Sequence, residues 1–357
     1  MPATPTPPPT TTPQTRIRPA RVTMQDVARA AQVSQTTVSF VLNDRAQASI
    51  PQETRDRIWQ AVTTLGYRPN AMARALRQGT SNLIGFVTDE IATTPFAGQI
   101  VRGAQDVAWQ HRRILMMINT DHQSDLEQEA LGALLQHQVD GIILAAMAHK
   151  AVTLPPLLEG FPVVLVNAYS EDDRVPAVVP DERRGGLEAT AHLLARGHRH
   201  IGVVDNLDAS MAATLRIDGH LQALTDAGIT PDPTLIARVN GWQEAGFDGA
   251  MQLLRRPDRP TALFCLNDRG AMGAYEAARE LGLHIPEDLS IIGFDNQEVI
   301  AAHLRPTLTT MQLPHHEMGR RGTLALLGTE PLPRGRTLLH CPLVERASVA
   351  RPTAPRR

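Results

Sequence analysis

Cysteine is scarce in this sequence, with two residues among 357. Cys265 and Cys341 have neither the paired spacing of a zinc site nor the density of a disulfide framework. Cys265 lies in an apolar run, which is typical of a small buried residue. The cysteines therefore predict neither a disulfide-stabilised secreted domain nor a thiolate metal site.

Catalytic and nucleotide-binding motifs are also missing. The sequence contains no Walker A loop, no GxGxxG and no GxSxG. Two histidine pairs, His198 with His200 and His315 with His316, lack a cysteine or carboxylate at a convincing ligand spacing. We therefore expect a protein that is not an enzyme and that has no metal site and no cofactor.

Long hydrophobic runs are absent as well. No apolar stretch approaches the roughly 18 residues of a transmembrane helix. The N-terminus lacks the basic segment followed by an apolar one that marks a secretory signal. Residues 1–20 are rich in proline and threonine and are expected to form a disordered tail. The sequence thus predicts a cytoplasmic protein without a membrane partner.

Charge is distributed unevenly along the chain. Residues 16–79 hold ten arginines and four acidic residues, a net charge of +6. The chain as a whole carries -2, so residues 80–357 carry -8. A basic N-terminal module on an acidic body is the arrangement expected when one end of the chain binds phosphate groups.

Residues 22–43 have the pattern of two short helices joined by a tight turn. Thr23 can cap the first helix, and Asp26 lies where a carboxylate is favourable near a helix N-terminus. Ser34 can cap the second helix. A third apolar stripe at residues 58, 61, 62 and 65 has helical spacing and can cover the other two helices. We predict an all-α helix-turn-helix domain over residues 21–68.

Compact hydrogen-bonding side chains occupy the start of the second helix. In a helix-turn-helix domain this end enters the DNA major groove, where such side chains reach base edges and phosphates. A capped helical hairpin without DNA contact is the alternative for this pattern taken alone. We expect Gln35 and Thr36 to select bases. We expect contacts to the DNA backbone from Thr23, Ser34, Thr37, Ser39, Asn43, Tyr67 and Asn70.

The motifs of this region occur in a fixed order. They are Val-Thr-Met-Gln-Asp-Val-Ala at 22–28, Val-Ser-Gln-Thr-Thr-Val-Ser at 33–39 and Leu-Gly-Tyr-Arg-Pro-Asn-Ala at 65–71. Together they resemble the DNA-binding headpiece of the lactose/galactose repressor (LacI/GalR) family. Similar landmarks continue to Pro-Leu-Val-Glu-Arg at 342–346, so the resemblance covers roughly residues 22–350.

This resemblance implies a hinge helix and linker at residues 69–80. In the family, two hinge helices pair in the minor groove at the operator centre, and a leucine wedges into the base step. Leu76 matches that leucine, with Ala73 packing beside it. Phe40 is a departure, because some relatives carry a base-reading arginine there. Phe40 can make only an apolar contact, for instance with a thymine methyl group.

Short apolar segments alternate with helical ones after residue 83, which predicts parallel sheets covered on both faces. A break near residue 180 divides them into two halves. The expected strands are residues 83–87, 114–119, 141–146, 163–167, 201–205, 235–240, 262–266 and 291–294. The expected helices are residues 100–109, 126–136, 186–195, 216–227, 243–255 and 271–281.

The resemblance implies that residues 81–357 form an α/β core like that of periplasmic sugar-binding proteins, with two doubly wound subdomains. Such a chain crosses between its subdomains three times. The first subdomain is expected to contain residues 81–180 and 309–340. The second is expected to contain residues 181–308 and the C-terminal residues.

Polar residues follow several predicted strands, where open α/β sheets bind ligands. Carboxylate and guanidinium groups together suit vicinal sugar hydroxyls, and an aromatic ring can cover the apolar sugar face. The alternative to ligand binding is that these residues form turns after the strands or pack in the core. From the residues and the resemblance, the expected effector-binding residues are Phe96, Asn167, Arg216, Trp242, Asn267, Asp295 and His315.

These observations predict a transcriptional repressor that binds a near-palindromic operator as a homodimer and responds to a small ligand, a sugar in the first instance. A purine effector and activation of transcription are alternatives within the family. A transport sugar-binding protein would need a signal peptide and has no use for the headpiece, and an enzyme on the same core would turn over a sugar. No heptad segment suggests a tetramer.

Overall fold

The computed structural model describes residues 22–42, 50–68, 80–92, 94, 97–205, 210–239, 241 and 243–353. The chain divides into two units, residues 1–79 and residues 80–357. We call the described part of the first unit the headpiece and the second unit the core.

The headpiece contains the three predicted helices, α1 (Met24–Ala30), α2 (Gln35–Leu42) and α3 (Gln52–Leu65). The cap expected at the first helix is present: Asp26 N donates to Thr23 Oγ1 at 3.3 Å, and Thr23 N donates to Asp26 Oδ2 at 2.9 Å. Apolar side chains from all three helices meet in a single small core. Its buried members are Val27, Ala28, Ala31, Val38, Val41, Ile58, Ala61 and Tyr67.

The first subdomain of the core is built on a sheet with strand order β11-β5-β4-β3-β1-β2. Every pairing within it is parallel. Its strands are β1 (Leu83–Thr88), β2 (Ile114–Asn119), β3 (Gly141–Ala151), β4 (Val163–Tyr169), β5 (Pro176–Pro180) and β11 (Gly335–Leu339). Its helices are α5 (Gly98–Gln110), α6 (Ser124–Gln136), the short η1 (Pro156–Leu158) and α12 (His315–Leu326).

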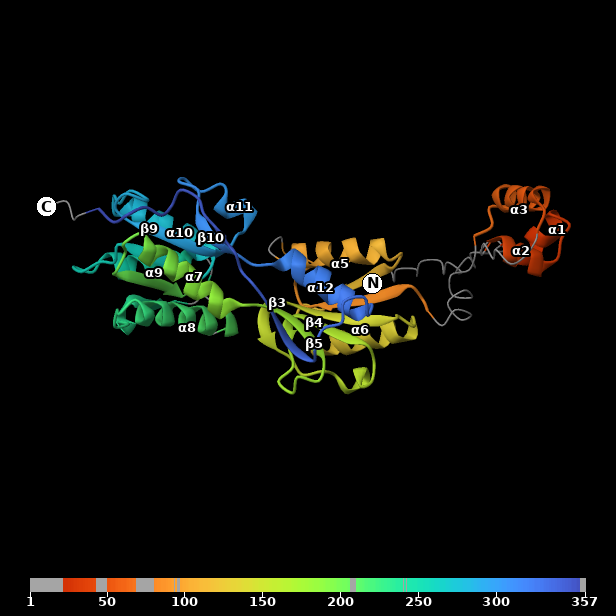
Figure 1. Ribbon diagram of the computed structural model, residues 1–357, viewed down its shortest axis with the longest axis horizontal. Helices are drawn as coiled ribbons and strands as arrows, with labels where there is room; N and C mark the ends of the chain where they lie inside the picture. Colours follow the sequence, from red (N-terminus) through yellow and green to blue (C-terminus); the bar gives the residue numbers. More distant parts are fainter. Residues whose placement is uncertain are drawn as a thin grey trace, which may run out of the picture. The chain divides into compact units, whose positions relative to one another are not determined.

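Side chains of the first sheet alternate between two apolar layers. Ile84 and Phe86 of β1 pack in the layer that contains residues of α5 and α12. Val87 packs in the layer that contains Leu131 and Leu134 of α6. The sheet therefore has helices on both faces (Figure 1), as the near-continuous apolar runs of its strands predict.

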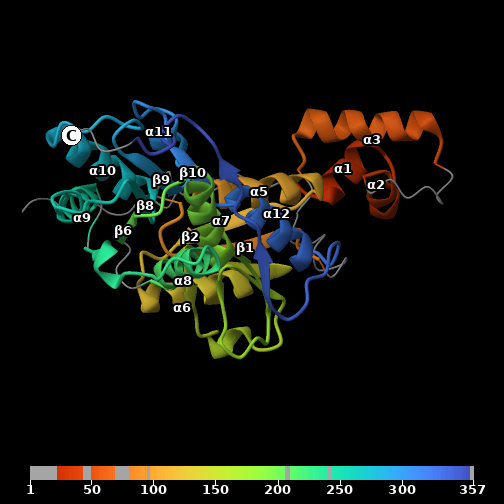
Figure 2. The ribbon, with the colours of Figure 1, turned by 60° about the vertical axis from the view of Figure 1, so that its left-hand side comes forward.

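The second subdomain has strand order β12-β10-β9-β8-β6-β7, parallel except where β10 pairs with β12. Helices α7 and α8 cover one face of the sheet, and α9 and α10 cover the other (Figures 1 and 2). Its strands are β6 (Ile201–Asp205), β7 (Ile236–Arg238), β8 (Ala262–Cys265), β9 (Ser290–Asp295), β10 (Thr309–Gln312) and β12 (Leu343–Val344). Its helices are α7 (Glu182–Ala195), α8 (Met211–Asp226), η2 (Pro233–Leu235), α9 (Gln243–Leu254), α10 (Asp268–Glu280) and α11 (Glu298–Ala301).

The chain passes between the two sheets three times. It crosses after Pro180, after Gln312 and after Leu339. The second crossing lies later than the sequence suggested, because β10 pairs with β9 of the second sheet. Residues 309–312 therefore belong to the second subdomain and not to the first. The short strands β5, β10, β11 and β12 were not among the expected strands.

Close packing of α7 on α8 depends on glycine. A Cβ at Gly186 would lie 2.1 Å from the carbonyl oxygen of Arg216, and a Cβ at Gly219 would lie 2.0 Å from that of Arg183. Both obstacles are backbone atoms, which cannot rotate away. These two glycines thus set the distance between the helices and position Arg216.

Replacing Gly186 with alanine should destabilise the protein by about 1–3 kcal/mol, because the added methyl group must force α7 and α8 apart. Urea unfolding would measure the loss. Gly132→Ala in α6 is a matched control, because nothing lies within 4 Å of its added Cβ. That change should stabilise the protein by about 0.5–1 kcal/mol. Equal behaviour of the two variants would contradict the close contact.

Candidate functional site

The start of α2 is exposed on the headpiece. Ser34 Oγ accepts a hydrogen bond from Thr37 N at 3.1 Å and lies 2.8 Å from Thr37 Oγ1. The two hydroxyl groups thus hold the first turn of the helix together, in the capping role predicted for Ser34. Gln35 and Thr36 between them are exposed. The turn therefore presents an amide and a hydroxyl side chain at the helix N-terminus.

Other predicted DNA-binding residues have roles inside the headpiece. The Thr23 hydroxyl donates to Asp26 Oδ2 at 2.7 Å. Ser39 and Phe40 are half-buried. Tyr67 is only 8% exposed and packs in the headpiece core, so little of its ring is open to a partner. Four further predictions lie outside the described residues: Asn43, Asn70, Ala73 and Leu76.

In the core, Arg216 of α8 is the centre of a buried cluster of charges. It is 3% exposed, and its Nε donates to Glu182 Oε2 at 2.6 Å. Its Nη1 donates to the Leu266 carbonyl oxygen and to Asp295 Oδ1, the latter at 3.4 Å. The guanidinium also stacks on the Phe294 ring, 3.7 Å from its centroid. Burial opposes its charge, but Glu182 and Asp295 outweigh burial and raise the pKa of Arg216.

Asp295 ends β9 and is 6% exposed. Its Oδ2 accepts a hydrogen bond from Gln297 Nε2 at 3.1 Å. Burial raises the pKa of Asp295 to about 7, although Arg216 and Gln297 act in the opposite direction. Asp268 is fully buried nearby and accepts hydrogen bonds from Thr310 Oγ1 at 2.6 Å and from Gln297 N at 2.7 Å. Burial and the negative charge of Asp295 raise its pKa as well.

The raised pKa of Asp295 predicts a pH dependence of stability. The native state keeps the Asp295 proton between about pH 4 and 7, whereas the unfolded state releases it near its ordinary pKa of 3.8. Asp295 should therefore make the free energy of unfolding fall as the pH rises through that window. Urea unfolding at several pH values, compared between the wild type and Asp295→Asn, checks this. The free energy of unfolding should fall less steeply in the variant, which has no carboxyl group at this position. An equal or steeper fall in the variant would mean that the pKa of Asp295 is not raised.

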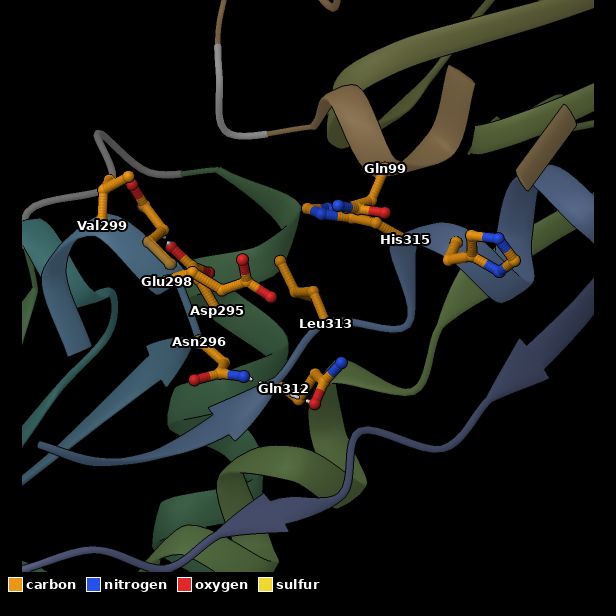
Figure 3. Close-up of a pocket in the computed structure, with 10 residues that line it drawn as sticks. Gln99, Asp295, Asn296, Glu298, Val299, Gln312, Leu313 and His315 are labelled. Atoms are coloured by element: carbon orange, nitrogen blue, oxygen red, sulfur yellow. Dashed lines mark hydrogen bonds between the residues drawn. The ribbon is translucent and has the colours of Figure 1, made fainter. Parts of the chain in front are cut away.

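A cavity of about 250 Å³ lies at the carboxyl end of β9. Asp295, Gln312 and Leu313 line it from the second subdomain. Gln99 of α5 and His315 of α12 line it from the first subdomain, as Figure 3 shows. The two subdomains thus both contribute side chains to one polar cavity at the edge of the sheets where ligands of α/β proteins bind.

The structure brings some of the predicted effector residues together and separates others. Asp295 and His315 line the cavity, and Arg216 contacts Asp295. Asn267 caps α10, where its Oδ1 accepts from Gly270 N at 2.7 Å. Asn167 Nδ2 donates to the carbonyl oxygens of Ala146 and Met147, so its amide group holds the backbone of β3. Phe96 and Trp242 lie outside the described residues.

Sequence reasoning missed Glu182, Gln297 and Gln99. Glu182 is 2% exposed, and only the folded chain reveals that its carboxylate pairs with Arg216. Gln297 follows Asp295 by two residues, so its position after a strand was a usable signal. Nothing in the pattern around Gln99 distinguishes it from a surface residue of α5.

Among the residues that the structure describes, no three His, Cys, Asp or Glu side chains are grouped as metal ligands would be. No helix in the described ranges combines the length and apolar character needed to cross a bilayer.

Comparison with known proteins gives matches over nearly the whole chain. Residues 23–70 match the family model of bacterial regulatory proteins of the lacI family. Residues 81–336 match that of periplasmic binding proteins and the sugar-binding domain of the LacI family. The transcriptional repressor CytR of Escherichia coli strain K12 is 34% identical over 336 residues, which cover 91% of this chain and 96% of CytR.

Solved structures agree with these matches. The lac repressor dimer bound to operator and an anti-inducer is 28% identical, with a TM-score of 0.78 and coverage of 92% of this chain and 99% of that one. A LacI family regulator from Enterococcus faecium with bound ribose is 29% identical, with a TM-score of 0.62. The match covers 76% of this chain and 100% of that one. The helix-turn-helix headpiece, the two parallel sheets and these full-length matches agree, and the chain belongs to the LacI family of DNA-binding transcriptional regulators.

Proposed function

We propose that this regulator is a repressor whose affinity for its operator changes when a small ligand, a sugar in the first instance, binds between the two core subdomains. The observation that carries the proposal is the cluster of Arg216, Glu182 and Asp295 beside a polar cavity that both subdomains line. A carboxylate and a guanidinium held in fixed positions can hydrogen-bond adjacent hydroxyl groups. Asn267 and His315 are included in this site.

On the DNA side, Gln35 and Thr36 select bases from the exposed start of α2. Ser34, Thr37, Thr23, Ser39 and the Tyr67 hydroxyl contribute phosphate contacts that fix the register of the headpiece. Residues 69–80 form the hinge, in which Leu76 and Ala73 enter the minor groove. Binding to chromosomal DNA would place the protein in the cytoplasm, at the nucleoid.

We infer that the protein works as a homodimer on a near-palindromic operator. The first sheet ends at β2, an edge strand on which Ile114 and Met117 are 62% and 44% exposed. Trp109 at the end of α5 is 76% exposed. An apolar edge of this kind is favourable to bury against a second copy. In each copy, closure of the two subdomains over the ligand would then shift the first subdomains of the dimer against each other. This shift would alter DNA affinity, a coupling of typically 1–3 kcal/mol.

A fluorescence-anisotropy titration tests the proposal. The full chain is titrated onto its own upstream DNA and onto a scrambled duplex, with and without a panel of sugars and purines. Specific binding that one sugar changes supports the whole proposal. Specific binding that only a purine changes would retain the site and replace the ligand class. Specific binding that no compound changes would contradict the effector site, and absence of specific binding would contradict the DNA-reading role of α2.

A further inference from the structure

Strand β3 contains an irregularity in its pairing with β4. Its pairing with β4 runs regularly to Ala145 opposite Val166 and resumes at Lys150 opposite Ala168, so residues 146–149 bulge out opposite Asn167. Asn167 has a left-handed backbone, with φ 55°, and its Nδ2 donates to the carbonyl oxygens of Ala146 and Met147 at 3.0 Å each. Strand β3 contacts α8 of the second subdomain. Bulges commonly re-aim a side chain at a functional site.

The last residue of this bulge is His149, and its environment is unusual. The side chain is 4% exposed, and the described residues offer neither ring nitrogen a hydrogen-bond partner. Its ring meets the edge of Tyr169, with centroids 5.5 Å apart. Burial, reinforced by the positive charges of Arg216 and Arg336, lowers the pKa of His149 to about 4. His149 is therefore neutral near pH 7, with one N–H donor and one acceptor nitrogen.

Two other buried histidines show what a structural role looks like in this protein. His198 bonds Thr261 and Ser290 and also the carbonyl oxygen of Ala350, at 2.9–3.0 Å. His220 lies 2.9 Å from the Thr190 hydroxyl. Buried polar groups are nearly always satisfied, so a buried imidazole without such partners needs an explanation beyond packing.

The charges around Arg216, whose positive charge acts on His149, limit what can bind near them. Arg216 already pairs with two acidic side chains, because Glu182 and Asp295 lie 2.6 Å and 3.4 Å from it. A phosphate group brought here would add negative charge beside the buried carboxylate of Glu182. Hydroxyl groups, which both donate and accept, suit a carboxylate, a paired guanidinium and a neutral imidazole equally.

This inference rests on the proposed effector function. We propose that His149 is a further side chain of the first subdomain that contacts the effector, in addition to those that line the cavity, and that the effector is an uncharged hydroxyl-bearing compound and not a phosphorylated one. The ring nitrogens are covered in this conformation, so the ligand reaches them when the bulge of β3 and α8 move apart. A ligand held by His149 and Arg216 then ties the two subdomains together.

The test begins with thermal unfolding of the full chain in the presence of ribose, glucose and adenosine, each beside its monophosphate. We expect an uncharged compound to raise the melting temperature and its phosphate to have no effect. Calorimetric titration of that compound follows, with His149→Phe and with His149→Asn and His149→Gln. The apolar variant should lose roughly tenfold or more in affinity, because a hydrogen bond is left unmade, whereas at least one amide variant should stay near the wild type. His220→Phe, a buried histidine already bonded to Thr190, is the control for a loss of stability alone.

The remaining outcomes overturn the proposal. Preference for a phosphate, or no response to any of the six compounds, would refute the ligand class. Wild-type affinity in His149→Phe, or an equal loss in His220→Phe, would refute the contact. If Arg216→Ala abolishes binding while His149→Phe does not, the proposed effector site stands and the assignment of His149 alone fails.

Discussion

Replacing Arg216 with alanine should lower the free energy of unfolding by about 3–5 kcal/mol and abolish the effect of ligand on DNA binding. The change leaves Glu182, which is 2% exposed, without its counter-charge, and removes one of the partners of Asp295. A buried carboxylate without a partner is far more costly than the loss of the hydrogen bonds alone. Urea unfolding and anisotropy with the same protein would measure the two effects.

Two further variants separate the loss of charge pairing from the loss of an arginine. Arg196 pairs with Glu345 on the surface, where the two side chains are 34% and 54% exposed. Arg196→Ala should change stability by no more than about 1 kcal/mol, since exposed ion pairs contribute little. Adding Glu182→Gln to Arg216→Ala should recover part of the lost stability, because it removes the unpaired charge. If Arg216→Ala and Arg196→Ala unfold alike, the buried cluster is not what holds this part of the core.

The double change Gln35→Ala and Thr36→Ala should remove most of the preference for the operator and preserve non-specific binding. Each good base contact in the major groove contributes about 1–3 kcal/mol of discrimination, so the pair together removes most of the preference for the operator. Phosphate contacts, which supply non-specific affinity, stay in place. Anisotropy titrations against the upstream DNA and a scrambled duplex at one salt concentration would give the ratio of the two affinities.

Gln60→Ala provides a matched control for this prediction. Gln60 is exposed on α3 of the same headpiece. Its loss should leave both affinities unchanged. A double variant that still prefers the operator as strongly as the wild type would move the base-reading role to other residues of the headpiece.

Much of the fold was predictable because strong local signals agreed with the tertiary structure. Strands β2 and β6 have the predicted bounds, Ile114–Asn119 and Ile201–Asp205, since each is a short apolar run with polar residues at its ends. The strand β5 was missed because prolines stand at both its ends, Pro176 and Pro180. The strand β10 was missed because four residues carry too little pattern, and its pairing with β9 depends on a partner in the folded sheet.

The sequence by itself determined which polar side chains stand at the ends of helices and strands. The capped turn at Ser34, the exposed Gln35 and Thr36, and the polar residues after β9 follow from local spacing, because helix caps and strand ends are decided by neighbours in the chain. Arg216 and Asp295 were both predicted as effector-binding residues, by their place in the pattern and by resemblance. Their contact with each other, at 3.4 Å, was not predicted.

Only the tertiary structure decided which polar groups are satisfied inside the protein. Asn167, expected to face the ligand, uses its amide group to hold the bulge of β3, whereas His149 is buried without a partner among the described residues. Glu182 gained its role from a contact with a residue 34 positions later in the chain. Burial and pairing of a charge depend on groups that are distant in sequence, and the cost of leaving one unpaired arises only when the folded chain excludes water from it.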